Sequence, residues 1–240
     1  MNSASTSAST PPGHTVLRVW DLPTRLFHWV LLVLVLMLFI SGHQGGDWMP
    51  WHARCGYGVL TLVLFRLVWG LVGGHHSRFK QFLPSPARLC NALQRTWRGP
   101  HLASVGHNPM GALSVIAFLL LLAVQAGSGL VSDDEIAFSG PLSAKVSASV
   151  VSLATWYHKE VGQQGLLALI VLHVAAIAYY RRRHGEHLVA AMIHGDKTVQ
   201  ADQATTQASR DGLRQRLHAL AWLVLCGLAV NALVNWGAGI

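Results

Sequence analysis

The chain has 240 residues, of which 52% are hydrophobic and only 12% are charged, and its mean hydropathy is positive at +0.38. Soluble domains carry about 25% charged residues, so this composition argues against a soluble protein and for one embedded in a membrane. The formal net charge of +8 does not indicate a nucleic-acid partner, because the basic residues gather in short segments beside apolar runs.

The first 15 residues, MNSASTSASTPPGHT, are rich in serine, threonine and proline. This composition predicts a disordered N-terminal tail, because too few apolar side chains are present to offset the entropy of ordering the chain. The segment lacks the charged start and the small-residue cleavage site of a signal peptide, so the first apolar run is interpreted as a retained helix.

Five apolar runs follow, each close to the ~20 residues that cross a bilayer as a helix. They cover residues 26–42, 52–73, 109–131, 157–180 and 217–236. The first run is the shortest and has to extend into its polar flanks, and the fifth is only moderately apolar. The pattern predicts an all-α integral membrane protein with a four-helix transmembrane bundle and a fifth, C-terminal transmembrane helix.

The charges of the connecting segments predict the orientation. The 75–107 and 181–216 segments are rich in lysine and arginine. The 43–51 loop has neither lysine nor arginine, and the 132–156 loop sets three carboxylates against Lys145 alone. An excess of lysine and arginine marks the cytoplasmic side. We therefore expect a cytoplasmic N-terminus, two acidic loops outside and a C-terminus on the outer side.

Four histidines lie in or at the edge of the predicted spans. His28 and His173 fall near the cytoplasmic ends of their spans, and His52 and His158 fall at the external starts of theirs. At ~1.5 Å per residue, His158 and His173 lie roughly 22 Å apart along one helix and about 60° apart around it. Depth therefore pairs His28 with His173 on the inner side and His52 with His158 on the outer side.

Each pair suits one iron held between two helices, because facing helices build cofactor sites in bundles. Two imidazoles close both axial positions of a haem, which favours electron transfer over oxygen chemistry. Arg66 lies near the depth of the inner pair, where a haem propionate would balance its charge. The alternative is that Arg66 reaches along its span to the inner interface.

The sequence resembles the prokaryotic cytochrome b561 family, the di-haem b-type group that includes the cytochrome b subunits of nickel-iron hydrogenases. The resemblance covers residues 16–197, which predicts a membrane domain there, a cytoplasmic linker over 198–216 and an extra helix over 217–240. Its motifs are VWDLPTRLFHW (19–29), WHARCGYGVLTLVLFRLVWGLVG (51–73), RFKQFLPSP (78–86), GHNPMGALS (106–114), GSGLVSDDEIAFSGPL (127–142) and VLHVAAIAYYRRRHGEHLVAAMIHGDK (171–197).

The resemblance implies a four-helix bundle in the bacterial inner membrane with two b haems, each held by two histidines. By motif, His28 and His173 hold the inner haem, and His52 and the histidine that opens the fourth span hold the outer one. The family spacing within that span is 14 residues, but His158 and His173 are 15 apart. A one-residue bulge would restore the alignment, and π-bulges often occur at functional sites.

Several polar side chains remain open as further candidates. His43 is the spare ligand for the outer haem and His107 for the inner one. A quinone site near the inner haem has a choice of five neighbouring residues, which the sequence alone does not separate: Arg25, His107, Asn108, His187 and His194.

The resemblance implies electron transfer between the membrane quinone pool and a periplasmic partner, which is a c-type cytochrome or an oxidoreductase complex. The chain lacks the motifs of soluble catalysis, such as HExxH, GxSxG or a glycine-rich nucleotide loop. It is interpreted as an electron-carrier subunit of a membrane complex, as a single copy or an oligomer. The alternatives are the cytochrome b anchor subunit of a nickel-iron hydrogenase and a haem-free transporter of metal ions or protons.

Overall fold

The computed structural model describes residues 13–83, 105–136, 138–200 and 207–239. Residues 1–12 of the predicted tail lie outside this part of the chain, as do Arg88, Arg95 and Arg98 of the basic 75–107 segment and positions 201–206 of the predicted linker.

The predicted spans are confirmed as five helices or helical stretches that are long and apolar enough to cross a membrane. They are α1 (Leu22–Gln44), α2 (Met49–Val72), α5 (Pro109–Val131), a continuous stretch over residues 148–184, and α9 (Leu213–Ala238). The stretch over 148–184 consists of α6 (Ala148–Trp156), the π-helix η4 (Tyr157–Gly162) and α7 (Gln163–His184). The first span extends into its polar flanks as expected.

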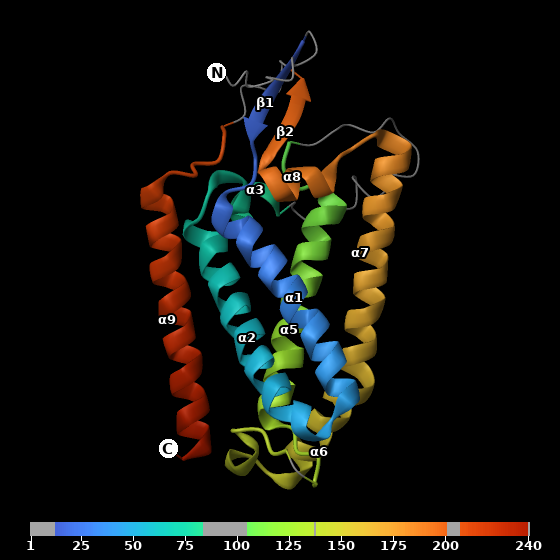
Figure 1. Ribbon diagram of the computed structural model, residues 1–240, viewed down its shortest axis with the longest axis vertical. Helices are drawn as coiled ribbons and strands as arrows, with labels where there is room; N and C mark the ends of the chain where they lie inside the picture. Colours follow the sequence, from blue (N-terminus) through green and yellow to red (C-terminus); the bar gives the residue numbers. More distant parts are fainter. Residues whose placement is uncertain (1–12, 84–104, 137, 201–206, 240) are drawn as a thin grey trace, which may run out of the picture.

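Four of these stretches form the bundle and α9 lies outside it. Helix α1 packs on α2, α2 on α5 and α5 on α7, and α9 packs on α2 on the side away from α7 (Figure 1). Helices α1 and α7 make few contacts with each other. The small buried core lies at mid-depth and is made of Val35, Val59, Val63, Leu119, Leu122 and Leu166.

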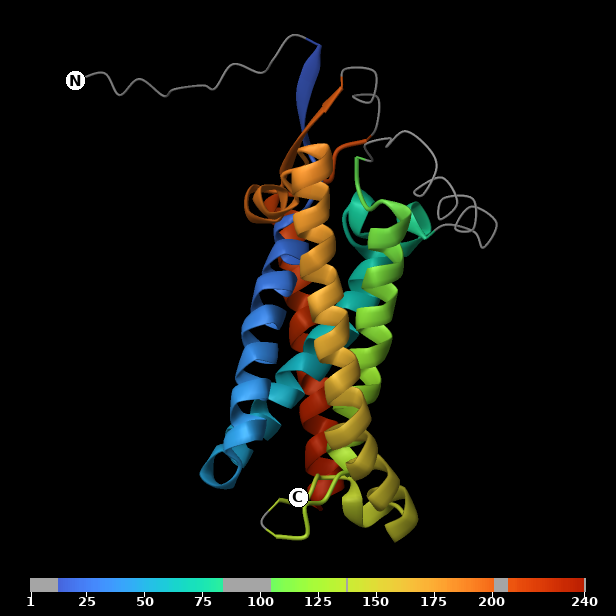
Figure 2. The ribbon, with the colours of Figure 1, turned by 90° about the vertical axis from the view of Figure 1, so that its right-hand side faces the viewer.

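A two-stranded antiparallel sheet covers one end of the bundle and was not predicted from the sequence. Strand β1 (His14–Arg18) pairs with β2 (Asp196–Gln200), with Arg18 opposite Asp196. The sheet projects beyond the helices in both views (Figures 1 and 2), and we call this end of the molecule the sheet end. The opposite end, where α1 meets α2 and α5 meets α6, is called the loop end.

Short helical segments complete the two ends. At the sheet end these are η2 (His75–Ser77), α3 (Phe79–Phe82) and α8 (Leu188–His194), and at the loop end they are η1 (Gly46–Trp48) and η3 (Ser143–Lys145).

The carboxylate of Asp21 ties three segments together at the sheet end. It is fully buried, and it caps α1 by accepting a hydrogen bond from the backbone N–H of Thr24 at 2.9 Å. It also accepts from the indole Nε1 of Trp69 on α2 at 3.2 Å. The backbone N–H of Gly74 at 3.0 Å and the hydroxyl of Ser77 at 3.2 Å complete its partners. The start of α1 is thereby fixed to the end of α2 and to the turn after it.

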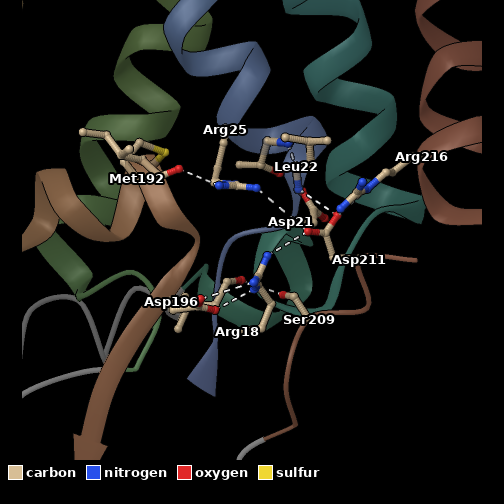
Figure 3. Close-up of polar contacts among 12 residues, drawn as sticks. Arg18, Asp21, Leu22, Arg25, Met192, Asp196, Ser209, Asp211 and Arg216 are labelled. Carbon is tan, nitrogen blue, oxygen red and sulfur yellow. Dashed lines mark hydrogen bonds and ion pairs between the residues drawn. The ribbon is translucent and has the colours of Figure 1, made fainter. Parts of the chain in front are cut away.

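The segment before α9 is anchored to the start of α1 through Asp211. Figure 3 shows Arg18 and Arg216 converging on this carboxylate, with N···O distances of 3.0 and 3.2 Å. The backbone N–H of Leu22 also donates to it at 3.1 Å. Burial opposes the charged form, but the hydrogen bonds from Arg216 and Leu22 and the charge of Arg18 outweigh it and hold the pKa of the Asp211 carboxyl below its usual value.

Helix α9 then runs the length of α2. Phe65 and Trp69 of α2 pack with Ala219 and Cys226 of α9 in a buried cluster. At the loop end the Lys145 ammonium lies 5.3 Å from the centre of the Trp236 ring. The fifth helix is therefore held at both ends as well as along its side.

We predict that Asp21→Ala lowers the free energy of unfolding by about 3 kcal/mol or more, because it strands four buried donors that now share one charged acceptor. Thermal unfolding of the protein in detergent measures the loss. Asp47→Ala is the matched control, because Asp47 is an exposed carboxylate in η1. Equal unfolding temperatures for the two variants would contradict the structural role given to Asp21.

Candidate functional site

The structure brings His52 and His158 together at the loop end. His52 lies in the first turn of α2, and His158 lies in the π-helix η4. The centres of the two imidazole rings are 6.0 Å apart and the ring planes make an angle of 76°. The two side chains therefore face each other from different helices, as their shared depth predicts.

Hydrogen bonds fix which nitrogen each ring presents. His158 Nδ1 lies 2.9 Å from the carbonyl oxygen of Gln125, which can only accept, so Nδ1 carries the proton. His52 Nδ1 lies 3.1 Å from the hydroxyl of Ser41, whose own proton is directed at the carbonyl of Met37 at 2.6 Å. His52 Nδ1 is therefore also the donor. In both rings the lone pair of Nε2 is left for a metal ion.

Both rings line a cavity of about 310 Å³ with largely apolar walls. A glycine packs closely against each ring. A Cβ atom at Gly42 would lie 3.2 Å from Cε1 of His52, and one at Gly129 would lie 2.9 Å from Cε1 of His158. His43 and Lys159 also line the cavity. His43 is exposed and its Nδ1 lies 2.8 Å from the carbonyl oxygen of Phe39.

The predicted bulge in the fourth span is confirmed as the π-helix over Tyr157–Gly162. A π turn holds one more residue than an α turn without changing the direction of the flanking helix. It therefore absorbs the fifteenth residue between His158 and His173. Gly162 permits the close approach of α5 here, because a Cβ atom at this position would overlap the side chain of Gln125.

His28 and His173 lie nearer the sheet end, on α1 and α7, the two helices of the bundle that make few contacts. They are close enough to interact electrostatically. The Nδ1 atom of His28 is buried and has no hydrogen-bond partner. The ring of Phe118 meets His173 edge-on, with centres 5.5 Å apart.

Arg66 lies inside the protein and does not reach solvent, with only 2% of its surface exposed. Its guanidinium group lies over the rings of Phe79 and Phe82, 5.1 and 5.9 Å from their centres. Its Nη1 atom is buried without a hydrogen-bond partner. The structure therefore favours a buried cation in need of an acceptor over an arginine that reaches the interface.

Two of the other polar candidates make structural hydrogen bonds at the sheet end. Arg25 donates to the carbonyl of Ile193, and Asn108 caps α5 by accepting from the backbone N–H of Gly111 at 2.6 Å. His187 and His194 are exposed.

His107, by contrast, has a buried Nδ1 without a hydrogen-bond partner. Its ring packs against those of Trp20 and Phe82, with centres 4.6 and 4.3 Å away.

Sequence reasoning missed the groups that orient the loop-end histidines. They are Ser41, Gln125 and Ser128, whose hydroxyl oxygen lies 3.2 Å from Nδ1 of His158, together with Gly42 and Gly129. The only signal was the presence of glycine and polar residues within otherwise apolar spans. Such residues are common in membrane helices for packing reasons alone. Their role beside the histidines can therefore be recognised only once the packing of the helices is known.

The loop-end arrangement would suit an iron held between the two imidazoles. An imidazole nitrogen ligates a metal at ~2 Å, so the ring centre lies roughly 3 Å from the metal and two opposed rings lie about 6 Å apart. The observed 6.0 Å agrees with this value. Two imidazoles, each oriented through Nδ1 beside an apolar cavity, suit haem b. A membrane helical bundle with such a site is typical of a b-type cytochrome.

Comparison with known proteins also indicates a b-type cytochrome. Residues 19–195 match the family model described as prokaryotic cytochrome b561. Three similar proteins are each named "Probable Ni/Fe-hydrogenase B-type cytochrome subunit". They come from Bradyrhizobium diazoefficiens (22% identical, covering 81% of this chain and 91% of the relative), Azotobacter chroococcum (23%, 79% and 91%) and Cupriavidus necator (22%, 75% and 86%). No solved structure matches the chain.

The family match spans well over half of the chain, so the protein belongs to the prokaryotic cytochrome b561 family. It is a multi-pass membrane cytochrome of the b type, which implies haem b and a role in electron transport.

We predict that Gly129→Ala weakens haem binding at the loop end, because the added methyl group pushes against the His158 ring. Overpacking of this kind costs about 1–3 kcal/mol. Gly127→Ala is the control on the same helix, because a Cβ atom there meets nothing within 4 Å. Haem bound per chain, measured after purification in detergent, should fall only in the first variant. Equal haem content in both variants would contradict the packing of Gly129 on His158.

Proposed function

We propose that the protein carries two b haems, one between His52 and His158 and one between His28 and His173, and passes electrons across the bacterial inner membrane. The observation that carries this proposal is the 6.0 Å separation of the His52 and His158 rings, with both Nε2 lone pairs available. Bound haem supplies a one-electron couple, and its potential is set by its ligands and surroundings.

The sheet-end haem rests on the placement of His28 and His173 on α1 and α7. The pair approaches across two helices that barely pack, and the unpartnered Nδ1 of His28 supports a ligand here. Arg66 supplies a buried positive charge from α2 at the same end. His158 and His173 lie roughly 22 Å apart along the fourth span, so haems held beside them would give electrons a path through the membrane.

The charges of the two ends support an orientation with the sheet end in the cytoplasm. Arg181, Arg182 and Arg183 close α7 at the sheet end, where α9 also begins with Arg214 and Arg216. The loop end instead presents Asp133, Asp134 and Glu135. By the positive-inside rule these charges favour an N-terminus in the cytoplasm and a C-terminus in the periplasm.

The electron partners follow from this orientation. We assign the quinone pool to the sheet-end haem and a periplasmic redox protein to the loop-end haem. Asp134 lines the loop-end cavity and belongs to an acidic turn, which would speed the encounter with a basic surface. We propose that this basic surface belongs to a c-type cytochrome or to the electron-transfer subunit of an oxidoreductase complex.

We predict that His52→Ala and His158→Ala each remove one haem, and that His28→Ala and His173→Ala each remove the other, because each haem would lose one of the two histidines that hold it. A dithionite-reduced minus oxidised spectrum, with haem counted per chain, measures the loss. His43→Ala is the control and should keep both haems, because its ring lines the cavity but is exposed. Retention of both haems in any of the four ligand variants would overturn the assignment of that histidine.

A hydrogenase partner is the second candidate, and the names of the relatives favour it. In that case the protein accepts electrons from a nickel-iron hydrogenase and delivers them to quinone.

We predict that hydrogen gas reduces the haems in membranes of the native organism, and that the reduction disappears in the His52→Ala variant. His43→Ala should behave as the wild type. Reduction by a c-type cytochrome and not by hydrogen would instead identify the first kind of partner.

A haem-free metal transporter finds less support. Within the described residues, no group of three or more His, Cys, Asp or Glu side chains could hold a metal ion without haem. The paired rings offer two ligands rather than the three or four of a protein-only site.

A further inference from the structure

Besides Nε of Arg25 and Nδ1 of His28, three buried nitrogen atoms near the sheet end have no hydrogen-bond partner within the described residues. They are Nη1 of Arg66, Nδ1 of His107 and Nε2 of His76. Buried polar atoms in folded proteins are nearly always paired, because leaving one unpaired costs about 1–3 kcal/mol. Three unpaired atoms in one region indicate that a shared partner belongs there.

The three groups belong to one cluster. The ring of Phe82 contacts both the Arg66 guanidinium and the His107 ring. His107 also interacts electrostatically with Arg66 and with His76. Burial, and then the neighbouring charge of Arg66, lowers the pKa of His107 to about 3, so the ring is neutral at physiological pH. The cluster therefore holds the positive charge of Arg66 and histidine rings with nitrogen atoms that lack a hydrogen-bond partner.

The carboxylate of Asp21 does not supply the missing hydrogen bond to Arg66. Asp21 interacts with Arg66 electrostatically, but its hydrogen bonds go to Thr24, Trp69, Gly74 and Ser77. The groups that pair with Asp21 therefore leave Nη1 of Arg66 without an acceptor. Among the residues that the structure describes, no acceptor therefore reaches Nη1 of Arg66, and an oxygen anion from outside the polypeptide would supply one.

The depth of Arg66 indicates where this anion comes from. Arg66 lies six residues before the end of α2, and His28 lies six residues after the start of α1. At ~1.5 Å per residue both lie roughly 9 Å from the sheet end. A carboxylate carried by a group between His28 and His173, and directed toward the sheet end, would reach the cluster.

We propose that Arg66 and His107, with His76 beside them, form a carboxylate-binding pocket that holds a propionate of the sheet-end haem. This inference rests on the proposed function and adds His107 and His76 to its binding residues. Arginine suits the task because its planar group stays charged and pairs with carboxylates through two hydrogen bonds. The aromatic rings of Phe79, Phe82 and Trp20 keep water from the pocket and strengthen the pairing.

A redox titration of the purified full-length chain tests the pocket. The His52→Ala background is used, so that only the sheet-end haem is titrated. A positive charge beside the haem stabilises the oxidised form less than the reduced form. Arg66→Gln should therefore lower the ratio of reduced to oxidised haem roughly tenfold at a fixed potential, which is ~59 mV for a one-electron couple.

Further variants separate the pocket from a general loss of structure. Arg66→Lys keeps the charge and should lie closer to the wild type. His107→Phe keeps the ring contacts with Trp20 and Phe82 but removes the nitrogen atoms, and should lower the ratio in the same direction by less. Arg54→Gln is the control, because Arg54 is an exposed arginine of α2 at the loop end and should leave the potential unchanged.

Loading the protein with haem dimethyl ester, whose propionates carry no charge, identifies the anion. Arg66→Gln should have no effect on the ester-loaded protein. An effect that persists with the ester and changes with added inorganic phosphate would assign the pocket to a free or lipid phosphate and overturn the proposal. Unchanged potentials in Arg66→Gln with ordinary haem would also overturn it. Retention of haem in His28→Ala or His173→Ala would instead refute the underlying ligand assignment.

Discussion

The buried carboxylate of Asp21 is the contact on which the sheet end depends. One side chain satisfies the first turn of α1, the indole of Trp69 on α2 and the turn after α2. It thereby sets where α1 begins relative to α2, and so the depth of His28 relative to Arg66. A carboxylate can be buried here because every one of its hydrogen-bond partners is a donor.

The loop end is governed by a different constraint, the shape of the fourth span. The π-helix inserts one residue beside His158, so that the residues after it keep their alignment with α5. The carbonyl of Gln125 and the hydroxyl of Ser41 then select the tautomer of each ring. Glycines behind the rings allow α1 and α5 to approach them. The cavity results from these local features rather than from loose packing, because the core next to it is buried.

Helix α9 adds a further contact to the start of α1. It lies outside the residues matched by the family model, yet Asp211 before it bonds to the start of α1, and its side packs on α2. The same short segment at the start of α1 is therefore held by Asp21 from within and by Asp211 from outside. Strand β1 leads directly into that segment and is paired with β2, which couples the end of α8 to α1 (Figure 1).

The sequence by itself determined the five spans, because a bilayer demands about 20 apolar residues in succession, and it determined the depth of each histidine, because the helical rise is fixed. It also indicated the bulge beside His158 through a spacing that was one residue too long. Only the tertiary structure decided the rest. The partners of Asp21, the tautomers set by Ser41 and Gln125, and the meeting of Arg66 with His107 join residues far apart in the chain. No local pattern encodes such contacts, which depend on how the helices rotate and pack against one another.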